Sequence, residues 1–250
     1  MEEIEKAAMA LLAELVPASP PPAAGQNMLP PDTRCDVDGT PLWRAHHGPA
    51  TLFVHGWNDT HRVWRHFALD FIANSRPALL MDLPAHGASR SSEYGGENSG
   101  KAVYDVCEAH APIDAIIAHS FGCVATANAL KRGAKADYVV LIAPPVLGWT
   151  ESLRRRGVDS AVLDRVLEVA RSMGNNELGP FDFERALADH QGKLLLIGSD
   201  ADIGCPIDSI SLTGAKIPGA EIHAVSGLGH RELCLDPGVL SKILEFLGYA

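Results

Sequence analysis

The fold of this 250-residue chain is indicated most clearly by Ile116-Ile117-Ala118-His119-Ser120-Phe121-Gly122. The apolar run over residues 113–118 is typical of a buried strand, and the small-residue segment over 121–131 predicts a helix. A serine therefore stands at an abrupt turn from strand to helix. Ala118 and Gly122, two residues to either side of this serine, are small, as such a crowded turn requires. This pattern makes Ser120 the candidate nucleophile.

Short apolar segments alternate with helical segments on both sides of this turn. Strands are predicted at residues 51–55, 78–81, 113–118, 138–142, 193–197 and 221–225. Helices are predicted at residues 62–73, 101–110, 121–131 and 237–247. Such alternation implies parallel strands, right-handed crossovers and helices on both faces of the sheet. We therefore expect an α/β fold with a doubly wound, mostly parallel sheet.

The N-terminal residues 1–30 lie outside this alternation. They predict a short amphipathic helix over 4–15, followed by a linker or surface strap, rich in Pro and Ala, over 17–31. A hairpin turning at Asp38-Gly39 then opens the regular pattern. We expect one α/β domain over residues 31–250.

A second irregularity separates the strands at 138–142 and 193–197. About fifty residues lie between them, more than a plain crossover needs. They include predicted helices over 160–173 and 181–188. We expect a small helical cap inserted at about 146–190, over the carboxyl edge of the sheet. An ordinary crossover helix with a long surface loop is the alternative.

His230 is the best candidate for the base that a serine nucleophile needs. It follows the last predicted strand, and the neighbouring glycines Gly227 and Gly229 allow its loop to reach the turn at Ser120. His119 is expected to point away from the reaction centre, although it adjoins Ser120.

Two aspartates follow the strand at 193–197, and either can orient the base and stabilise its charged form. Asp202, four residues before Pro206, is the preferred acid, and Asp200 is the alternative. The preceding strand offers no acid before Glu151. The chain order of serine, aspartate and histidine is the one that this architecture requires.

His55-Gly56-Trp57 closes the first buried strand and predicts a tight turn near the same edge of the sheet. The backbone N–H of Trp57 is expected to pair with that of Phe121 in an oxyanion hole. The side chain of Trp57 is expected to wall the substrate pocket, with a plain core aromatic residue as the alternative.

Composition narrows the location and the partners. The formal net charge of −10 and the pI of about 5.5 oppose binding to nucleic acid or to an anionic membrane. Five scattered cysteines with no C-x-x-C pair indicate reduced thiols. The first residues are acidic, unlike a secretory signal, and no apolar run is long enough to span a bilayer. We expect a cytoplasmic protein.

Several motifs taken together resemble the α/β-hydrolase superfamily, in the family's order and from about residue 35 onward. They are His55-Gly56-Trp57, Asp82-Leu83-Pro84-Ala85-His86-Gly87-Ala88-Ser89, Ala118-His119-Ser120-Phe121-Gly122, Gly198 through Pro206, and Gly229-His230. The first two look like a bacterial group mostly described as hydrolases without assigned substrates. The resemblance implies that the Asp82 stretch is a structural loop and that His86 is structural.

The sequence departs from the family pattern in two places. Ala118 replaces the first glycine of the turn, and the acid lies one residue further from Gly198 than is usual. The second departure leaves the choice between Asp200 and Asp202 open. Residues 1–30 match no part of the family pattern.

The resemblance implies two-step acyl transfer on an ester, thioester or other activated small-molecule acyl substrate, with no metal or organic cofactor. Haloalkane and epoxide chemistry is disfavoured, because those relatives carry an aspartate where Ser120 stands. Hydrolysis of a carbon–carbon bond in a dioxo acid uses the same residues and is an alternative. A non-catalytic ligand-binding member of the fold is another. Nothing in the sequence indicates an oligomeric state.

Overall fold

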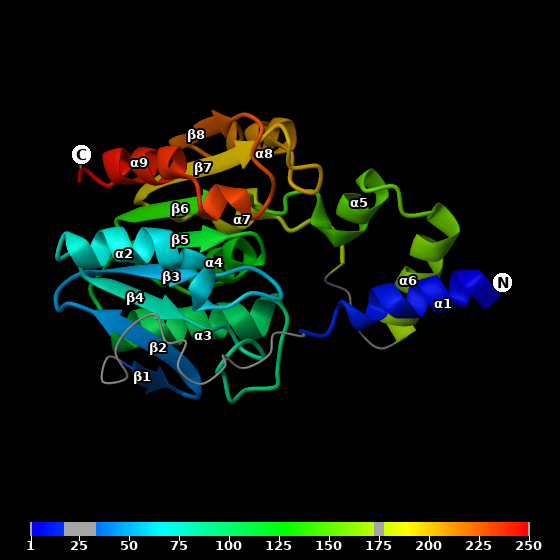
Figure 1. Cartoon of the computed structure of the whole chain (residues 1–250), viewed down its shortest axis with the longest axis horizontal. Coiled ribbons are helices and arrows are strands. Elements are labelled where there is room, and N and C mark those ends of the chain that lie inside the picture. Colours follow the sequence, from blue (N-terminus) through cyan, green and yellow to red (C-terminus); the bar gives the residue numbers. More distant parts are fainter. Residues whose placement is uncertain (1, 18–33, 173–177, 250) are drawn as a thin grey trace.

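An eight-stranded sheet forms the centre of the computed structural model, which describes residues 2–17, 34–172 and 178–249 (Figure 1). The strand order is β1-β2-β4-β3-β5-β6-β7-β8. The strands are β1 (Arg34–Val37), β2 (Thr40–Ala45), β3 (Ala50–Val54), β4 (Ala78–Met81), β5 (Ile113–His119), β6 (Tyr138–Ile142), β7 (Lys193–Ser199) and β8 (Ala220–Val225). β2 is antiparallel to β1 and β4, and the other pairs are parallel. The predicted fold class is confirmed.

Helices cover both faces of this sheet. α2 (Arg65–Ala73) and α9 (Pro237–Phe246) lie on one face, and α3 (Gly96–Ala109), α4 (Phe121–Lys131) and α8 (Ile207–Gly214) lie on the other (Figure 1). Two short 3-10 helices, η2 (His61–Trp64) and η3 (Glu232–Cys234), precede α2 and α9. The central strands β3 and β4 are buried along their whole length, which explains their unbroken apolar sequences.

Among the described residues, three helices separate β6 from β7: α5 (Gly148–Arg155), α6 (Ser160–Ser172) and α7 (Phe183–Ala186). α7 is shorter than the predicted helix over 181–188, and its Phe183 is buried in the main core. α6 instead packs against the N-terminal helix α1 (Glu2–Ala13). Figure 1 shows α1, α5 and α6 beyond one edge of the sheet.

The contact between α1 and α6 has its own apolar cluster, separate from the main core. Its buried members are Ala8, Val162, Val166, Ala170 and Leu178. The predicted strap over 17–31 falls almost entirely outside the described residues, as does the segment 173–177 that follows α6.

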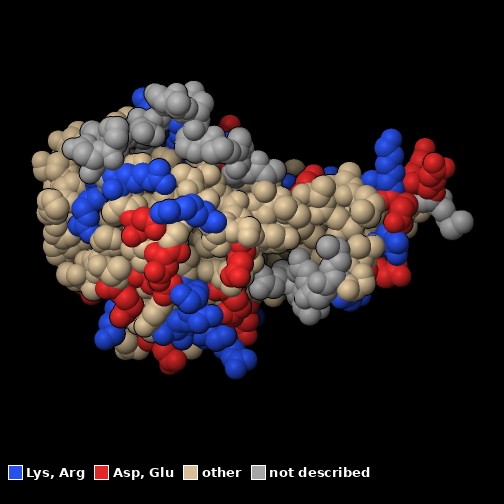
Figure 2. Space-filling view, turned by 90° about the horizontal axis from the view of Figure 1, so that it is seen from below, with Lys and Arg blue, Asp and Glu red and all other residues tan. Residues whose placement is uncertain are grey.

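Charged side chains of both signs lie on the surface of the described residues (Figure 2). On the face seen in Figure 2, Lys and Arg side chains are interspersed with Asp and Glu side chains over the main body. None of the described helices combines the length and the apolar character needed to cross a membrane.

Gly122 holds α4 close against β3. A Cβ atom at this position would lie 2.5 Å from the carbonyl oxygen of His55 and 2.6 Å from that of Val54. We expect Gly122→Ala to lower the free energy of unfolding by about 2 kcal/mol, because overpacking against backbone outweighs the ~1 kcal/mol that alanine gains in helix propensity. Urea unfolding followed by circular dichroism measures the change.

Gly179 supplies the matched control for this substitution. No atom of the described residues lies within 4 Å of a Cβ built there. Gly179→Ala should therefore change the free energy of unfolding by less than about 0.5 kcal/mol. A Gly122→Ala protein as stable as the wild type would contradict the close approach of α4 to β3.

Candidate active site

Ser120 stands at the apex of the turn between β5 and α4. Its backbone has φ 52° and ψ −122°, a left-handed conformation that a non-glycine residue adopts only under constraint. The N–H of Ser120 donates to the carbonyl oxygen of Ile142 on β6 (2.9 Å), and its own carbonyl accepts from the N–H of Cys123 (2.9 Å). These two bonds fix the strained turn between the sheet and the helix.

His230 lies beside the hydroxyl of Ser120. The distance from its Nε2 to Ser120 Oγ is 2.8 Å. The imidazole is carried by the loop that follows β8, and its side chain is 28% exposed, so one edge is accessible to solvent. The structure therefore brings together two residues that are 110 positions apart in the sequence.

Asp202 completes the chain of hydrogen bonds. Its Oδ2 lies 2.6 Å from His230 Nδ1, and its Oδ1 accepts from the N–H groups of Gly204 (3.1 Å) and Cys205 (3.0 Å). Burial alone raises the pKa of Asp202, but the His230 bond and charge and these two N–H groups outweigh it, so the pKa lies below its ordinary value. The carboxylate stays ionised although its side chain is only 2% exposed.

The partners of His230 define its tautomer. An ionised carboxylate only accepts hydrogen bonds, so Nδ1 carries the ring proton and donates it to Asp202. Nε2 is then the unprotonated nitrogen that accepts from the hydroxyl of Ser120. The arrangement is suited to withdraw the proton of that hydroxyl.

Asp200, the alternative acid, lies elsewhere. Its Oδ1 accepts from the N–H of Gly227 at 2.8 Å, and the residue is exposed. The Gly227 N–H and a bond from Ser226 lower the pKa of Asp200. Asp200 thus holds the loop that leads to His230, and the structure brings Asp202, not Asp200, to the imidazole.

The two expected oxyanion donors lie on either side of Ser120. Phe121 follows it directly, and a Cβ atom on Gly56 would lie 3.0 Å from the Ser120 Cβ, so the residue preceding Trp57 abuts the serine. The Trp57 and Phe121 rings meet edge to face, with centroids 4.9 Å apart. Neither backbone N–H has a hydrogen-bond acceptor within the described part of the chain.

His119 is a correction to the sequence-based expectation, because it does not point away from the site. Its ring centroid is 4.7 Å from that of His230, and its Nε2 lies 3.0 Å from the His230 carbonyl oxygen. Burial lowers the pKa of His119 to about 3, with a further decrease from the His230 charge. A neutral His119 therefore donates to the backbone that carries the base.

A buried polar cluster supports the loop that carries Trp57, and the sequence did not reveal its contacts. His55 lies 2.7 Å from the Gly56 carbonyl through Nδ1 and accepts from the Leu83 N–H through Nε2 (3.0 Å). Asp82 accepts from the N–H (2.7 Å) and Nδ1 (2.8 Å) of His61. His55 and Asp82 meet because each follows one of two parallel neighbouring strands, β3 and β4. The sequence indicated that both residues lie at strand ends, but not that the two strands are neighbours.

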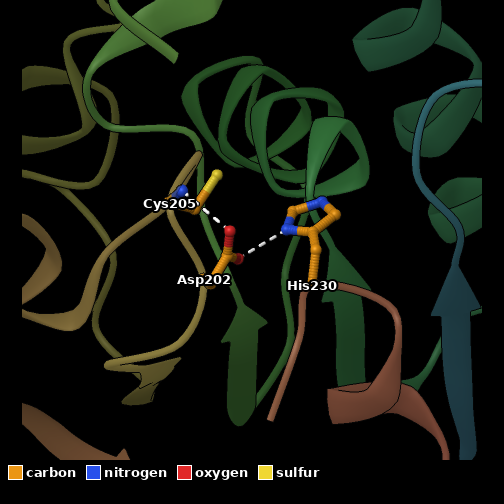
Figure 3. Close-up of side chains that lie close together, drawn as sticks. All are labelled: Asp202, Cys205 and His230. Atoms are coloured by element: carbon orange, nitrogen blue, oxygen red, sulfur yellow. Dashed lines mark hydrogen bonds and ion pairs between the residues drawn. The ribbon is translucent and has the colours of Figure 1, made fainter. Parts of the chain in front are cut away.

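Among the described residues, one group of side chains is spaced closely enough to bind a metal ion (Figure 3). It consists of Asp202, Cys205 and His230. Their ligand atoms lie within 4.8 Å of one another. The 2.6 Å between Asp202 and His230 is shorter than the about 3.3 Å between two ligands of one tetrahedral zinc ion. Burial also raises the pKa of the Cys205 thiol, whereas metals bind the thiolate. Asp202 and His230 are therefore placed to share a proton rather than to bind a metal ion.

Comparison with known proteins identifies the family and the fold. Residues 51–191, more than half of the chain, match the model of the Alpha/beta hydrolase family. A search of curated proteins found no match.

Solved structures share the fold at low sequence identity. The esterase RhEst1 from Rhodococcus sp. ECU1013 is 17% identical with a TM-score of 0.65, over 86% of this chain and 97% of that one. A thermophilic esterase from Thermogutta terrifontis is 15% identical with a TM-score of 0.65, over 86% and 98%. The hydrolase olei00960 from Oleispira antarctica is 14% identical with a TM-score of 0.66, over 84% and 94%. At these identities the likeness is one of fold.

Proposed function

The chain belongs to the alpha/beta hydrolase family, and on that premise we propose that it is a serine hydrolase that cleaves an ester, thioester or similar acyl bond of a small molecule. One observation carries the proposal. A continuous chain of hydrogen bonds runs from Ser120 Oγ through both ring nitrogens of His230 to the carboxylate of Asp202. A serine alcohol is a weak nucleophile at neutral pH, and such a chain is what activates it.

The first half of the reaction forms an acyl-enzyme. Ser120 Oγ attacks the carbonyl carbon of the substrate as its proton moves to His230 Nε2. The ionised Asp202 stabilises the imidazolium that results. His230 then returns the proton to the leaving alcohol or thiol as the tetrahedral intermediate collapses.

The second half releases the acid. Water, deprotonated by His230, attacks the acyl-enzyme, and Ser120 recovers its proton as it leaves. In both halves the backbone N–H groups of Trp57 and Phe121 stabilise the negative oxygen of the tetrahedral intermediate. Loss of one such donor costs roughly 10²–10³ in rate in other hydrolases.

The helices between β6 and β7 are the proposed cap over the substrate. α5 begins shortly after the carboxyl end of β6, the edge at which Ser120 and His230 meet. The guanidinium of Arg156, just past α5, lies against Gly204 in the loop of Asp202. On this proposal, α5 and α6 shape the acyl site. Because two of the similar folds are esterases, an ester is the first substrate to test.

Labelling with a fluorophosphonate tests the proposal without knowledge of the natural substrate. The probe forms a bond to an activated serine oxygen, so we expect one labelled peptide that contains Ser120 and no labelling of Ser120→Ala. A panel of p-nitrophenyl esters and acyl thioesters, run on the same two proteins, measures turnover. Labelling at another residue, or a folded wild-type protein that hydrolyses no member of the panel and takes up no probe, would overturn the proposal. The latter result favours a ligand-binding role.

A further inference from the structure

The side chain of Trp57 is tied to the N-terminal helix. Its indole Nε1 donates to the backbone carbonyl oxygen of Glu14 at 2.8 Å, across 43 positions of sequence. Carbonyl groups at the end of a helix lack intrahelical donors, and Glu14 directly follows the last residue of α1. The residue whose backbone N–H is the proposed oxyanion donor thus has its side chain bonded to the residue that follows α1.

An aromatic group around Trp57 sets the direction of this indole. Its ring meets the rings of Phe121, His86 and Tyr94 edge to face, with centroids 4.9, 5.2 and 5.9 Å away. Asn58, the next residue, has a positive φ of 54°. The turn at Trp57 is therefore held by these ring contacts and by the bond to Glu14.

α1 can act as an anchor because it is itself docked on α6. Ala8 is fully buried in the apolar cluster between the two helices. At the surface, Glu5 pairs with Arg165 through two hydrogen bonds of 2.7 and 3.1 Å. Figure 1 shows α1 lying alongside α6, with the chain leaving α1 toward the sheet.

We propose that Trp57 is a positioning residue through which docking of α1 on α6 holds the oxyanion loop in its reactive geometry. This inference rests on the proposed function, because it takes the Trp57 N–H as an oxyanion donor. It gives residues 2–14, which match no part of the family pattern, a role in the reaction. Such donors stabilise the transition state only when they are held in place, and a displacement of about 1 Å can lower the rate by about 10²-fold.

Two substitutions on α1 separate docking from other effects on the helix. Ala8→Asp places a carboxylate in the buried contact with α6, whereas Met9→Asp places one at a neighbouring position that is 52% exposed. We expect Ala8→Asp to lower kcat on a small acetyl ester by about tenfold with little change in KM. Met9→Asp should stay within about twofold of the wild type. Equal rates for the two variants would overturn the proposal.

Trp57→Phe tests the link itself, because it keeps the backbone N–H and an aromatic ring but removes the indole donor. We expect a fall in kcat of about tenfold, smaller than the loss of an oxyanion donor outright. Since both changes break the same connection, Ala8→Asp combined with Trp57→Phe should be no slower than either alone. Multiplicative effects would show that α1 does not act through Trp57.

A measurement that is independent of activity separates failure of this inference from failure of the proposed function. The chain has four tryptophans, and the indole signal that is missing in Trp57→Phe identifies Trp57 in an amide-proton NMR spectrum. Its exchange with solvent should accelerate in Ala8→Asp and not in Met9→Asp. Unchanged exchange overturns the link to α1, even in an active enzyme. If exchange accelerates in Ala8→Asp but the wild-type protein hydrolyses no substrate, the link between α1 and Trp57 is real. Its catalytic role is then wrong, together with the proposed function.

Discussion

Replacing Asp202 by asparagine is expected to lower kcat by about 10⁴-fold while leaving the fold intact. The carboxylate of Asp202 fixes the ring proton of His230 on Nδ1, at a distance of 2.6 Å. An amide in its place can donate to Nδ1, which then favours the tautomer with its proton on Nε2. That nitrogen can no longer accept the proton of Ser120, and the charge that stabilises the imidazolium is also lost.

Asp200→Asn is the matched control, since the same change is made two residues away. Asp200 accepts from the N–H of Gly227, and an asparagine oxygen can still accept that bond. We expect its kcat to stay within about threefold of the wild type. Steady-state kinetics on one ester compare both variants with Ser120→Ala, which sets the lower limit. If Asp200→Asn is the slower protein, the acid has been assigned to the wrong aspartate.

The inner strands of the sheet could be predicted because they are almost entirely apolar. A run such as 138–142 has no polar face, so it fits a strand covered by helices on both sides, and β6 occupies those residues. The turn at Ser120 was predictable because Ala118 and Gly122 are small, and the structure shows why: a Cβ on Gly122 would clash with the backbone of His55. Both predictions rest on residue types, apolar in the strands and small at the turn, that can be read directly from the sequence.

The site was less predictable where the answer depended on the path of a loop. Asp200 and Asp202 both follow β7, and only the turn fixed by Gly204 and Cys205 decides which carboxylate reaches His230. His119 was misjudged for a similar reason. Neighbouring residues of a strand point to opposite faces, but the left-handed backbone of Ser120 ends that alternation.

The helices α5 and α8 were not predicted, and for α8 the reason is that its stability comes from tertiary packing. α8 reads Ile-Asp-Ser-Ile-Ser-Leu-Thr-Gly, a sequence of weak intrinsic helix formers. Ile207 and Ile210 are nevertheless buried, and both would contact a Cβ on Gly198 of β7. The docking of α1 on α6 was unpredictable in the same sense, because the apolar faces of two helices do not identify each other in a sequence.

Acidification from pH 6.5 to pH 4 is expected to lower the free energy of unfolding of this protein by about 6 kcal/mol, because two buried histidines are neutral in the folded state. Burial lowers the pKa of His55 to about 4 and that of His119 to about 3, from 6.5. If His55 is protonated, its Nε2 becomes a donor that faces the N–H of Leu83, so the hydrogen bond between them is lost. If His119 is protonated, its Nδ1–H has no acceptor among the described residues.

The direction of this change in stability depends on which state, folded or unfolded, binds more protons. Between the folded and unfolded pKa values the unfolded chain holds more protons, so stability falls as pH falls. Each group contributes about 1.4 kcal/mol per pH unit in that window. At pH 4 the two histidines together remove about 6 kcal/mol, within the 5–15 kcal/mol that typically stabilises a domain. Asp82 and Asp202, whose pKa values are also lowered, add losses of the same sign only below their ordinary value of 3.8.

Urea unfolding at pH 7, 6 and 5 measures this slope. Between pH 6 and pH 5 we expect the wild type to lose about 2 kcal/mol from the two histidines, and His119→Gln to lose about 1 kcal/mol less. Glutamine cannot be protonated in this range, yet its amide can still donate to the carbonyl of His230, the bond that His119 makes. His47→Gln, at an exposed position, should leave the slope unchanged. A His119→Gln protein with the slope of the wild type would mean that His119 is already charged in the folded state, and the neutral donor beside His230 would have to be abandoned.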